Sequence, residues 1–318
     1  MVGADLQQGL GKRTTGGLGL ILVFGGNGQL GRALARQSVL RGIKLLALSR
    51  SEGDITDPGA IESAIAQWPP DVVVNAAAYT KVDLAESNLD QARLSNEIGP
   101  GRLANACDRA GIPLIHLSTD YVFDGQKTEA YLETDPICPI NVYGRSKAAG
   151  EDAVRSALDR HLILRTAWLY GEVGENFFNT ILRLAVTRDE LRIVADQHGS
   201  PTSARAIAEA ILQIAPSLAR TGTAYGTYHL TASGATTWHG FASRIIALSA
   251  AKIGRNPVVT PIRTVDFPSA AKRPLNSVLS SRKFAQAFDI SLRDWADELP
   301  TVIAGAFGSS SPASRHVA

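Results

Sequence analysis

The sequence predicts an α/β fold: a Rossmann-type doubly wound parallel sheet with a smaller C-terminal α/β lobe. Three observations lead to this prediction. Short apolar runs alternate with helical patterns, the runs are apolar throughout, and a glycine-rich turn joins the first run to the first helix. Continuously apolar strands are typical of parallel sheets buried on both faces, and right-handed crossovers then place helices on both sides. The runs are LGLILVF, IKLLALS, DVVVNAAA, IPLIHLST and HLILRTAWLY.

Four helices are expected among and after these strands. The second has the clearest start, because Asp57 can accept hydrogen bonds from free helical N–H groups and Pro58 suits the first helical position. The third ends at Gly111, since glycine readily adopts the left-handed conformation found at helix ends. The predicted helices span residues 29–41, 54–67, 89–110 and 143–158.

After about residue 171 the alternation becomes less regular. We expect this part of the chain to form a smaller lobe from segments that leave the main sheet. The predicted helices here span residues 176–187, 203–214, 238–250 and 292–304, and the predicted strands span residues 191–196, 225–231 and 258–264.

Composition excludes several classes of function. The net charge of +2 over 318 residues is too small to indicate a nucleic-acid partner. No apolar stretch approaches the ~18 residues of a membrane span. Cys107 and Cys138 are too few for a disulfide framework or a cysteine-rich metal site, which fits a reduced, cytoplasmic setting. The histidines His116, His198 and His229 are too scattered for a metal site and are interpreted as structural.

The glycine-rich turn, GGNGQLG, places Gly25, Gly28 and Gly31 between a strand and a helix. Glycines there permit a tight turn, close backbone approach to a pyrophosphate, and close packing of helix on strand. The free N–H groups of the helix also attract phosphate. We therefore predict a bound dinucleotide rather than a glycine-rich turn without a ligand.

Arg50 follows the second strand, where an enzyme that uses NAD often has an acidic residue for the ribose 2′-hydroxyl. An arginine can instead meet a 2′-phosphate, which favours NADPH, although a solvated loop arginine fits the sequence equally well. The carboxylate of Asp54 can accept a hydrogen bond from an adenine amino group.

Tyr143 and Lys147 lie four residues apart on a predicted helix and so project from one face. An ammonium nearby favours the phenolate and lowers the pKa of the tyrosine. Thr119 ends the fourth strand, at the sheet edge where ligands gather. These three side chains together predict a site for proton transfer, although the Tyr/Lys pair alone is also common on exposed helix surfaces.

The residues that carry these motifs resemble the extended short-chain dehydrogenase/reductases, and among them the dTDP-4-dehydrorhamnose reductases. The resemblance covers residues from about 20 to about 302, so it includes the predicted lobe. The matching segments are GGNGQLG, DITD, NAAAYTKVDLAE, STDYVFDG, NVYGRSKAAGE, LRTAWLYG, DQHGSPT and RPLNSVLS.

The resemblance implies NADPH- or NADH-dependent reduction of the C4 keto group of a deoxysugar nucleotide. Tyr143 is then the proton donor, Lys147 holds the nicotinamide ribose and lowers the pKa of Tyr143, and Thr119 assists at the same oxygen. The implied cofactor-binding residues are Gly25, Gly28, Gln29, Leu30, Gly31, Arg50, Asp54, Ile55, Ala77, Ala78 and Thr80, besides Tyr143 and Lys147.

The substrate-binding residues expected are Thr119, Asp120, Trp168 and Arg273. The first three fall where the family contacts the sugar nucleotide, and the Arg273 guanidinium suits a diphosphate. Without the family, Asp120 is equally a turn residue, Trp168 a core aromatic and Arg273 a surface arginine. Asn96 resembles the asparagine that supports the catalytic lysine through water.

Some members of the family bind Mg²⁺ at a subunit contact through clustered acidic residues. No matching cluster is evident in the sequence, so Mg²⁺ and a homodimer stay open, while the expected small-molecule partner is a nucleotide sugar. Two other functions remain alternatives. One is a non-catalytic regulatory subunit like that of methionine adenosyltransferase, and the other is a nucleotide-sugar epimerase or dehydratase. A dehydratase commonly has Asp-Glu after the threonine, whereas Tyr121 follows Asp120 here.

The same observations predict the domain organisation. A flexible N-terminal extension covers residues 1–19, an NAD(P)-binding Rossmann domain residues 20–170, and a substrate-binding lobe residues 171–304. Residues of about 200–231 are expected to return to the Rossmann domain, and residues 305–318 to form a disordered tail.

Overall fold

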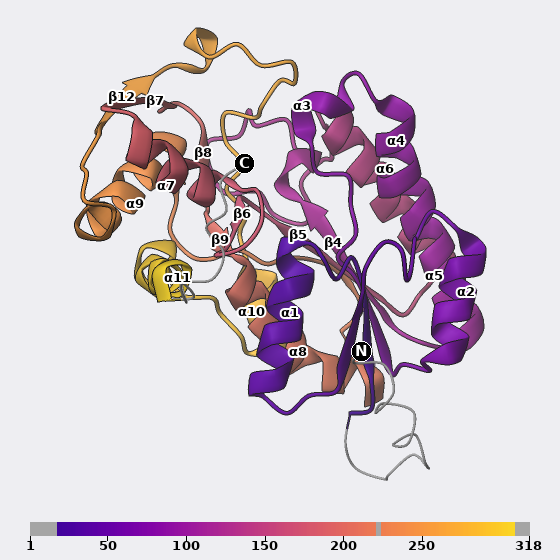
Figure 1. Cartoon of the computed structure of the whole chain (residues 1–318). Coiled ribbons are helices and arrows are strands. Elements are labelled where there is room, and N and C mark those ends of the chain that lie inside the picture. Colours follow the sequence, from indigo (N-terminus) through magenta and orange to yellow (C-terminus); the bar gives the residue numbers. More distant parts are fainter. Residues whose placement is uncertain (1–17, 221–223, 309–318) are drawn as a thin grey trace.

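The central feature of the computed structural model is a six-stranded sheet, all of whose strands run parallel. The structure describes residues 18–220 and 224–308. Helices cover both faces of the sheet (Figure 1). The strand order is β10 (Gly226–His229), β5 (His161–Thr166), β4 (Leu114–Thr119), β3 (Val72–Asn75), β1 (Ile21–Phe24) and β2 (Leu45–Leu48). The predicted doubly wound α/β fold is thereby confirmed.

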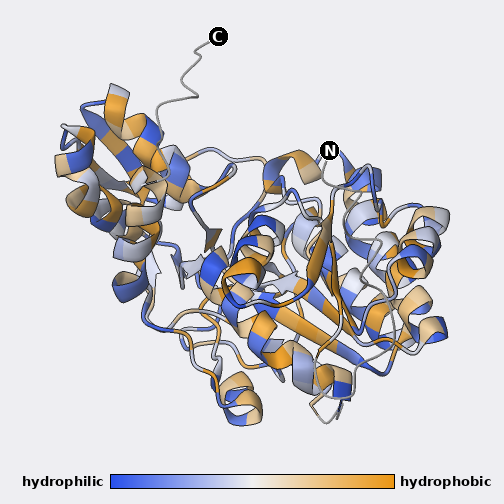
Figure 2. Ribbon diagram, turned by 60° about the horizontal axis from the view of Figure 1, so that its bottom comes forward, coloured by the Kyte–Doolittle hydropathy of each residue, from blue (hydrophilic) through white to orange (hydrophobic). Residues whose placement is uncertain are grey.

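Burial on both faces explains why the strands are apolar throughout. In β1 every residue is buried, and successive side chains enter opposite layers of the core. Ile21 and Val23 pack under helices α1 (Gln29–Leu40) and α8 (Ala204–Arg220), which contact each other. Leu22 and Phe24 face the other layer, beneath α2 (Pro58–Gln67) and α5 (Gly99–Ala110). Figure 2 shows the central strands as mostly hydrophobic and the surrounding helices as mixed.

A smaller lobe has its own core. It is formed by α7 (Phe177–Thr187), α9 (Trp238–Ile253) and α11 (Trp295–Gly308), together with the parallel pair β7 (Glu190–Val194) and β12 (Val258–Ile262). These elements gather on one side of the sheet in Figure 1. Short strand pairs join the lobe to the sheet region: β6 (Leu169–Tyr170) with β9 (Thr202–Ser203), and β8 (His198–Gly199) with β11 (Thr236–Thr237).

The chain returns from the lobe to the main sheet in one segment. Helix α8 packs against α1, and β10 pairs in parallel with β5. Helix α10 (Arg282–Phe288) packs beside β10. Helix α10 and the short helix α3 (Val82–Ala85) were not predicted, because neither is long enough to show a clear helical repeat of apolar residues.

Several predicted boundaries differ from the structure. Helix α2 begins at Pro58, with Asp57 as its cap, because the Asp54 side chain holds residues 54–57 in a turn. The predicted third helix is formed by α4 (Leu89–Arg93), the π-helical turn η2 (Leu94–Ile98) and α5, and Gly111 ends it as expected. Helix α6 spans Val142–Ala157.

The predicted disordered tail begins too early, because α11 continues to Gly308 and anchors its apolar side in the lobe. The rest of the predicted tail, residues 309–318, and residues 1–17 of the predicted N-terminal extension lie outside the described residues. At the start of the described chain, the Gly19 N–H donates to the Asp71 carboxylate over 2.5 Å. Within residues 18–220 and 224–308, none of the helices combines the length and apolar character that crossing a membrane requires.

Candidate active site

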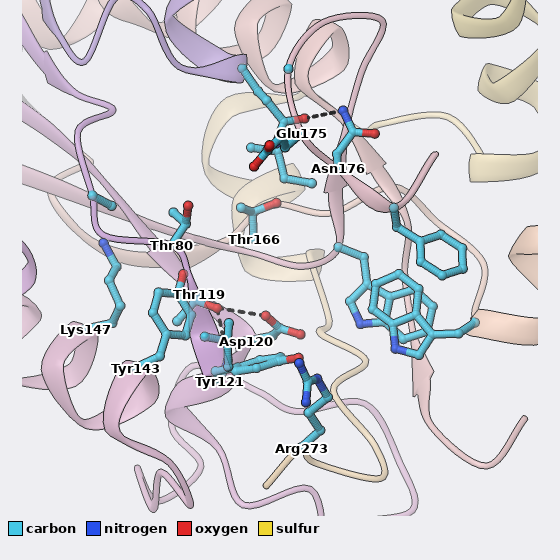
Figure 3. A pocket seen from close by; sticks show the side chains of 18 of the residues that line it. Thr80, Thr119, Asp120, Tyr121, Tyr143, Lys147, Thr166, Glu175, Asn176 and Arg273 are labelled. Carbon is cyan, nitrogen blue, oxygen red and sulfur yellow. Dashed lines mark hydrogen bonds between the residues drawn. The ribbon is translucent and has the colours of Figure 1, made fainter. Parts of the chain in front are cut away.

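A cavity of about 800 Å³ lies between the carboxyl edge of the parallel sheet and the smaller lobe. This is where doubly wound sheets bind ligands. Figure 3 shows side chains from both parts pointing into it. Predicted site residues that line the cavity are Gly28, Gln29, Leu30, Ala78, Thr80, Thr119, Asp120, Tyr143, Lys147, Trp168 and Arg273.

The glycine-rich turn forms one end of the cavity. Gly25 has φ +89°, and a Cβ atom there would lie 2.5 Å from the backbone nitrogen of Ala77. Gly28 is the N-cap of α1 and supplies no side-chain cap, so the first N–H groups of the helix are available to a ligand. A Cβ on Gly31 would collide with the carbonyl oxygen of Gly25. The backbone thus forms a cradle that only glycine permits, and a pyrophosphate fits its chemistry.

Lys147 is buried under the cavity, one turn along α6 from Tyr143. Its Nζ donates to the backbone oxygen of Leu117 over 2.5 Å. Burial lowers the pKa of Lys147 to about 8, and the negative charge of Glu151 acts in the opposite direction. The side chain therefore remains largely charged near neutral pH but titrates only a little above it.

Tyr143 lies beside Thr119 at the floor of the cavity (Figure 3). Burial raises the pKa of Tyr143 to about 12, hydrogen bonding with Thr119 lowers it, and the charge of Asp120 raises it. The net shift is therefore upward, opposite to the lowering expected from Lys147, because loss of solvent around the phenolate dominates. The consequence is a phenol that keeps its proton at neutral pH.

Asp120 is a buried carboxyl group directly after the strand that ends in Thr119. Its Oδ1 accepts from the Thr119 hydroxyl over 2.9 Å. Burial raises the pKa of Asp120 to about 6, against the hydrogen bonds from Ser277 and Thr119 that lower it. Its Oδ2 makes no close hydrogen bond to any other residue that the structure describes.

The cavity also has an aromatic wall, which consists of Trp168, just after β5, and of Phe177 and Trp238 from the lobe. The rings of Trp168 and Trp238 stack with centroids 3.5 Å apart and planes 6° from parallel, and Phe177 lies 4.5 Å from Trp238. Trp168 has φ +46°, a strained value for a residue with a Cβ atom. The role of Trp238 in this wall was not predictable from the sequence, because no motif relates it to Trp168, seventy positions earlier.

Arg273 reaches the cavity from the loop before α10, but its guanidinium is already engaged. It forms two parallel hydrogen bonds with the Asp83 carboxylate, of 2.7 and 3.1 Å. Although burial opposes the charge, the hydrogen bonds that Arg273 donates to Asp83 raise the pKa of Arg273, and Tyr121 contributes in the same direction. A cation is thus held in place beside Tyr121 at the cavity wall (Figure 3).

Other predicted cofactor residues lie outside the cavity lining: Gly25, Gly31, Arg50, Asp54, Ile55 and Ala77. The exposed Arg50 pairs with Asp54 over 2.9 Å, and Asp54 also accepts from the N–H and hydroxyl groups of Thr56. Ile55 is buried in the core beneath α5. The groups proposed for the adenine end are therefore adjacent to one another.

Asn96 lies buried in the π-helical turn η2. It accepts from the Tyr79 N–H over 2.8 Å, and its amide donates to the Tyr79 oxygen and to the Ser146 hydroxyl, both over 3.0 Å. Ser146 precedes Lys147, so Asn96 joins the loop after β3 to the helix of the lysine. π-helical turns often occur at functional sites.

The three histidines do not come together. His116 bonds to Asn75 in the sheet, and His229 lies near Arg165, while His198 is exposed in β8. Within the part of the chain that the structure describes, no group of three or more His, Cys, Asp or Glu side chains is placed to hold a metal ion.

Comparisons with known proteins identify the family to which the chain belongs. The family described as "RmlD substrate binding domain" matches residues 19–306. A dTDP-4-dehydrorhamnose reductase from Burkholderia thailandensis is 45% identical over 86% of this chain and 95% of its own. A crystal structure of a dTDP-4-dehydrorhamnose reductase from Clostridium acetobutylicum is 38% identical, with a TM-score of 0.83 over 90% of this chain and 98% of its own. The Bacillus anthracis reductase, solved in complex with NADP, is 34% identical with a TM-score of 0.83, over 90% and 99% of the two chains.

Proposed function

Because the chain belongs to the dTDP-4-dehydrorhamnose reductase family, we propose that it reduces the C4 keto group of dTDP-4-dehydro-β-L-rhamnose to give dTDP-L-rhamnose. The electron donor is NADPH or NADH. The observation that carries the proposal is the meeting of Thr119, Tyr143 and Lys147 in one cavity with the N-terminus of α1. A proton donor beside a dinucleotide cradle is the combination that such a reduction requires.

A bound reduced nicotinamide supplies the hydride. The residues around it fit such a cofactor, because the cradle at Gly25 excludes any side chain and the first N–H groups of α1 are available for phosphate. Gln29 and Leu30 then meet the pyrophosphate, and Ala78 and Thr80 line the cleft. Arg50 and Asp54 are assigned to the adenosine end together with Ile55 and Ala77.

Tyr143 donates its proton to the developing C4 alkoxide. The raised pKa of Tyr143 keeps the donor protonated at neutral pH, as a reduction requires. Thr119 shares the substrate oxygen, and the Lys147 ammonium stabilises the phenolate left behind. Asp120 and Trp168 are assigned to the sugar nucleotide, and Arg273, held by Asp83, to its diphosphate.

The assignment is tested by incubating the purified protein with dTDP-4-dehydro-L-rhamnose and either NADPH or NADH. We expect the absorbance of the reduced nicotinamide to fall and dTDP-L-rhamnose to form. Turnover only with another nucleotide sugar would keep the chemistry and replace the substrate. No turnover with any keto sugar, together with capture of a synthetase partner, would instead support a regulatory subunit.

The first prediction concerns cofactor binding at the cradle around Gly25. Gly25→Ala combines a left-handed backbone with a collision against Ala77, so we expect cofactor Kd to rise about tenfold or more, equivalent to about 1.4 kcal/mol. Gly42→Ala is the matched control, because Gly42 also has a positive φ but a Cβ atom there meets nothing within 4 Å. Fluorescence titration with NADPH measures both. Equal Kd values for the two variants would contradict the cradle.

The second prediction concerns substrate binding at the aromatic wall. Trp238→Ala removes the ring that supports Trp168, so we expect KM for the sugar nucleotide to rise about tenfold, since stacking on a base contributes ~1–3 kcal/mol. The kcat should change little, because the ring of Trp238 packs on Trp168 and Phe177 and serves no proton transfer. Trp238→Phe, which retains a ring, should recover part of the affinity. An unchanged KM in Trp238→Ala would exclude the wall from substrate binding.

A further inference from the structure

A buried ion pair lies next to the proposed catalytic groups, and the mechanism above does not use it. Glu151 occupies α6 one turn after Lys147 and is completely buried. The guanidinium of Arg165, on β5, donates to both its oxygens over 2.8 and 2.7 Å. A buried pair of this kind is no sure source of stability, because desolvation of both charges opposes their attraction. Its position therefore calls for another explanation.

The second contact of Glu151 links two catalytic elements. Its Oε1 accepts from the Ser118 hydroxyl over 2.5 Å. Ser118 precedes Thr119 at the end of β4, whereas Glu151 belongs to the helix that carries Tyr143 and Lys147. Lys147 makes a parallel connection, since its Nζ donates to Leu117 on the same strand. Strand and helix are thus joined twice, at successive turns of α6 after the proposed proton donor.

We propose that Glu151 is a positioning residue, which holds the end of β4 against α6 through Ser118 and supplies the negative charge beside Lys147. This inference rests on the proposed reductase function, which needs Thr119, Tyr143 and Lys147 in one fixed geometry. The Arg165 guanidinium keeps Glu151 ionised and fixes the direction of its carboxylate.

The charges around the pair support the second part of the proposal. The titratable groups that face Lys147 and Glu151 from the packed elements are His116 on β4, Arg155 on α6, Arg165 on β5 and His229 on β10. Burial lowers the pKa of both histidines far enough to leave them neutral. Among these groups Glu151 is the single anion beside three cations, and its charge raises the pKa of Lys147.

Two substitutions separate the two roles. Ser118→Ala removes the link and keeps every charge, so we expect kcat to fall about tenfold with cofactor Kd and substrate KM within twofold. Glu151→Gln removes the charge, so the pKa of Lys147 should fall, and the loss of activity at high pH should begin at a lower pH by roughly one unit. A merely structural role would lower kcat at every pH without changing the pH at which activity is lost.

Asp152→Asn is the matched control. Asp152 is the next residue of α6, and its replacement removes the same charge. Its side chain is exposed and pairs with Arg155. Its pH profile should be that of the unchanged protein. If Glu151→Gln loses activity at the same high pH as the unchanged protein, the electrostatic role is overturned. If the kcat of Ser118→Ala stays within twofold, the positioning role is overturned. If Glu151→Gln does not fold, because Arg165 is left unpaired, Ser118→Ala still decides whether the link matters.

A measurement without substrate keeps this inference separate from the proposed function. In protein labelled with ¹³C at lysine Cε, the resonance missing from Lys147→Arg identifies Lys147, and its titration gives the pKa. We expect a lower pKa in Glu151→Gln than in the unchanged protein, and equal values would overturn the electrostatic role. Lack of turnover by the unchanged protein would count against the reductase function alone.

Discussion

Replacing Tyr143 by phenylalanine is expected to lower kcat by about 10³-fold, the contribution typical of a positioned general acid. The substitution removes the phenol hydroxyl that hydrogen-bonds with Thr119 in the cavity and leaves the ring that packs edge-on against Tyr121. Because the ring remains, cofactor affinity should stay within about threefold. Initial rates with the sugar nucleotide, together with NADPH titration, measure the two quantities separately.

Tyr225→Phe serves as the control for this experiment. The Tyr225 hydroxyl also hydrogen-bonds, to the backbone oxygen of Leu218 and to Arg160, but it lies away from the cavity. Its kcat should match that of the unchanged protein. A Tyr143→Phe variant that is folded, binds NADPH and turns over at more than a third of the normal rate would refute Tyr143 as the proton donor.

Replacing Lys147 by methionine should lower kcat/KM by about 10²-fold and weaken cofactor binding as well, because the ammonium serves both the phenolate and the ribose. Methionine fills a similar volume and so keeps the buried position packed. The Leu117 oxygen, however, loses its donor. Lys252→Met, on α9, removes a lysine that lies over the Phe307 ring and should have no effect on either quantity.

The pH dependence of the unchanged protein follows from the same lysine. The pKa of Lys147 is lowered to about 8, and the charged form is the active one. The rate of reduction should therefore be highest below that pH and should fall as the pH rises through about 8. The phenol of Tyr143 does not impose this limb, because its pKa is raised to about 12. A kcat/KM profile, which reports the groups of the free enzyme, should show this loss. A kcat/KM profile that stays flat to pH 10 would show that the Lys147 proton is not required.

Local patterns were sufficient to predict the sheet. The β1 residues ILVF are buried on both sides, and this double burial is what produces a continuously apolar run. Asp57 and Pro58 marked the start of α2 because a cap acts on its immediate neighbours. Thr119, Tyr143 and Lys147 were also predictable, since two lie on one helix and the third ends a strand.

Features that depend on distant residues were not predictable in the same way. The Asp83–Arg273 pair joins residues 190 positions apart, and nothing near either residue indicates the other. The pKa of Tyr143 went in the unexpected direction because it depends on how much solvent the fold excludes, whereas the sequence shows only that a lysine is near. The π-helical turn around Asn96 likewise arises from packing against α6.

The position of β10 has a consequence for how the chain is made. This strand completes the sheet beside β5, yet α7, β7 and α8 come between the two in the sequence. During synthesis the backbone N–H and C=O groups on one side of β5 therefore have no β10 partner until residues 226–229 have left the ribosome. Exposed strand edges of this kind promote aggregation, so a chain truncated between β5 and residue 226 is expected to aggregate rather than to form a smaller enzyme.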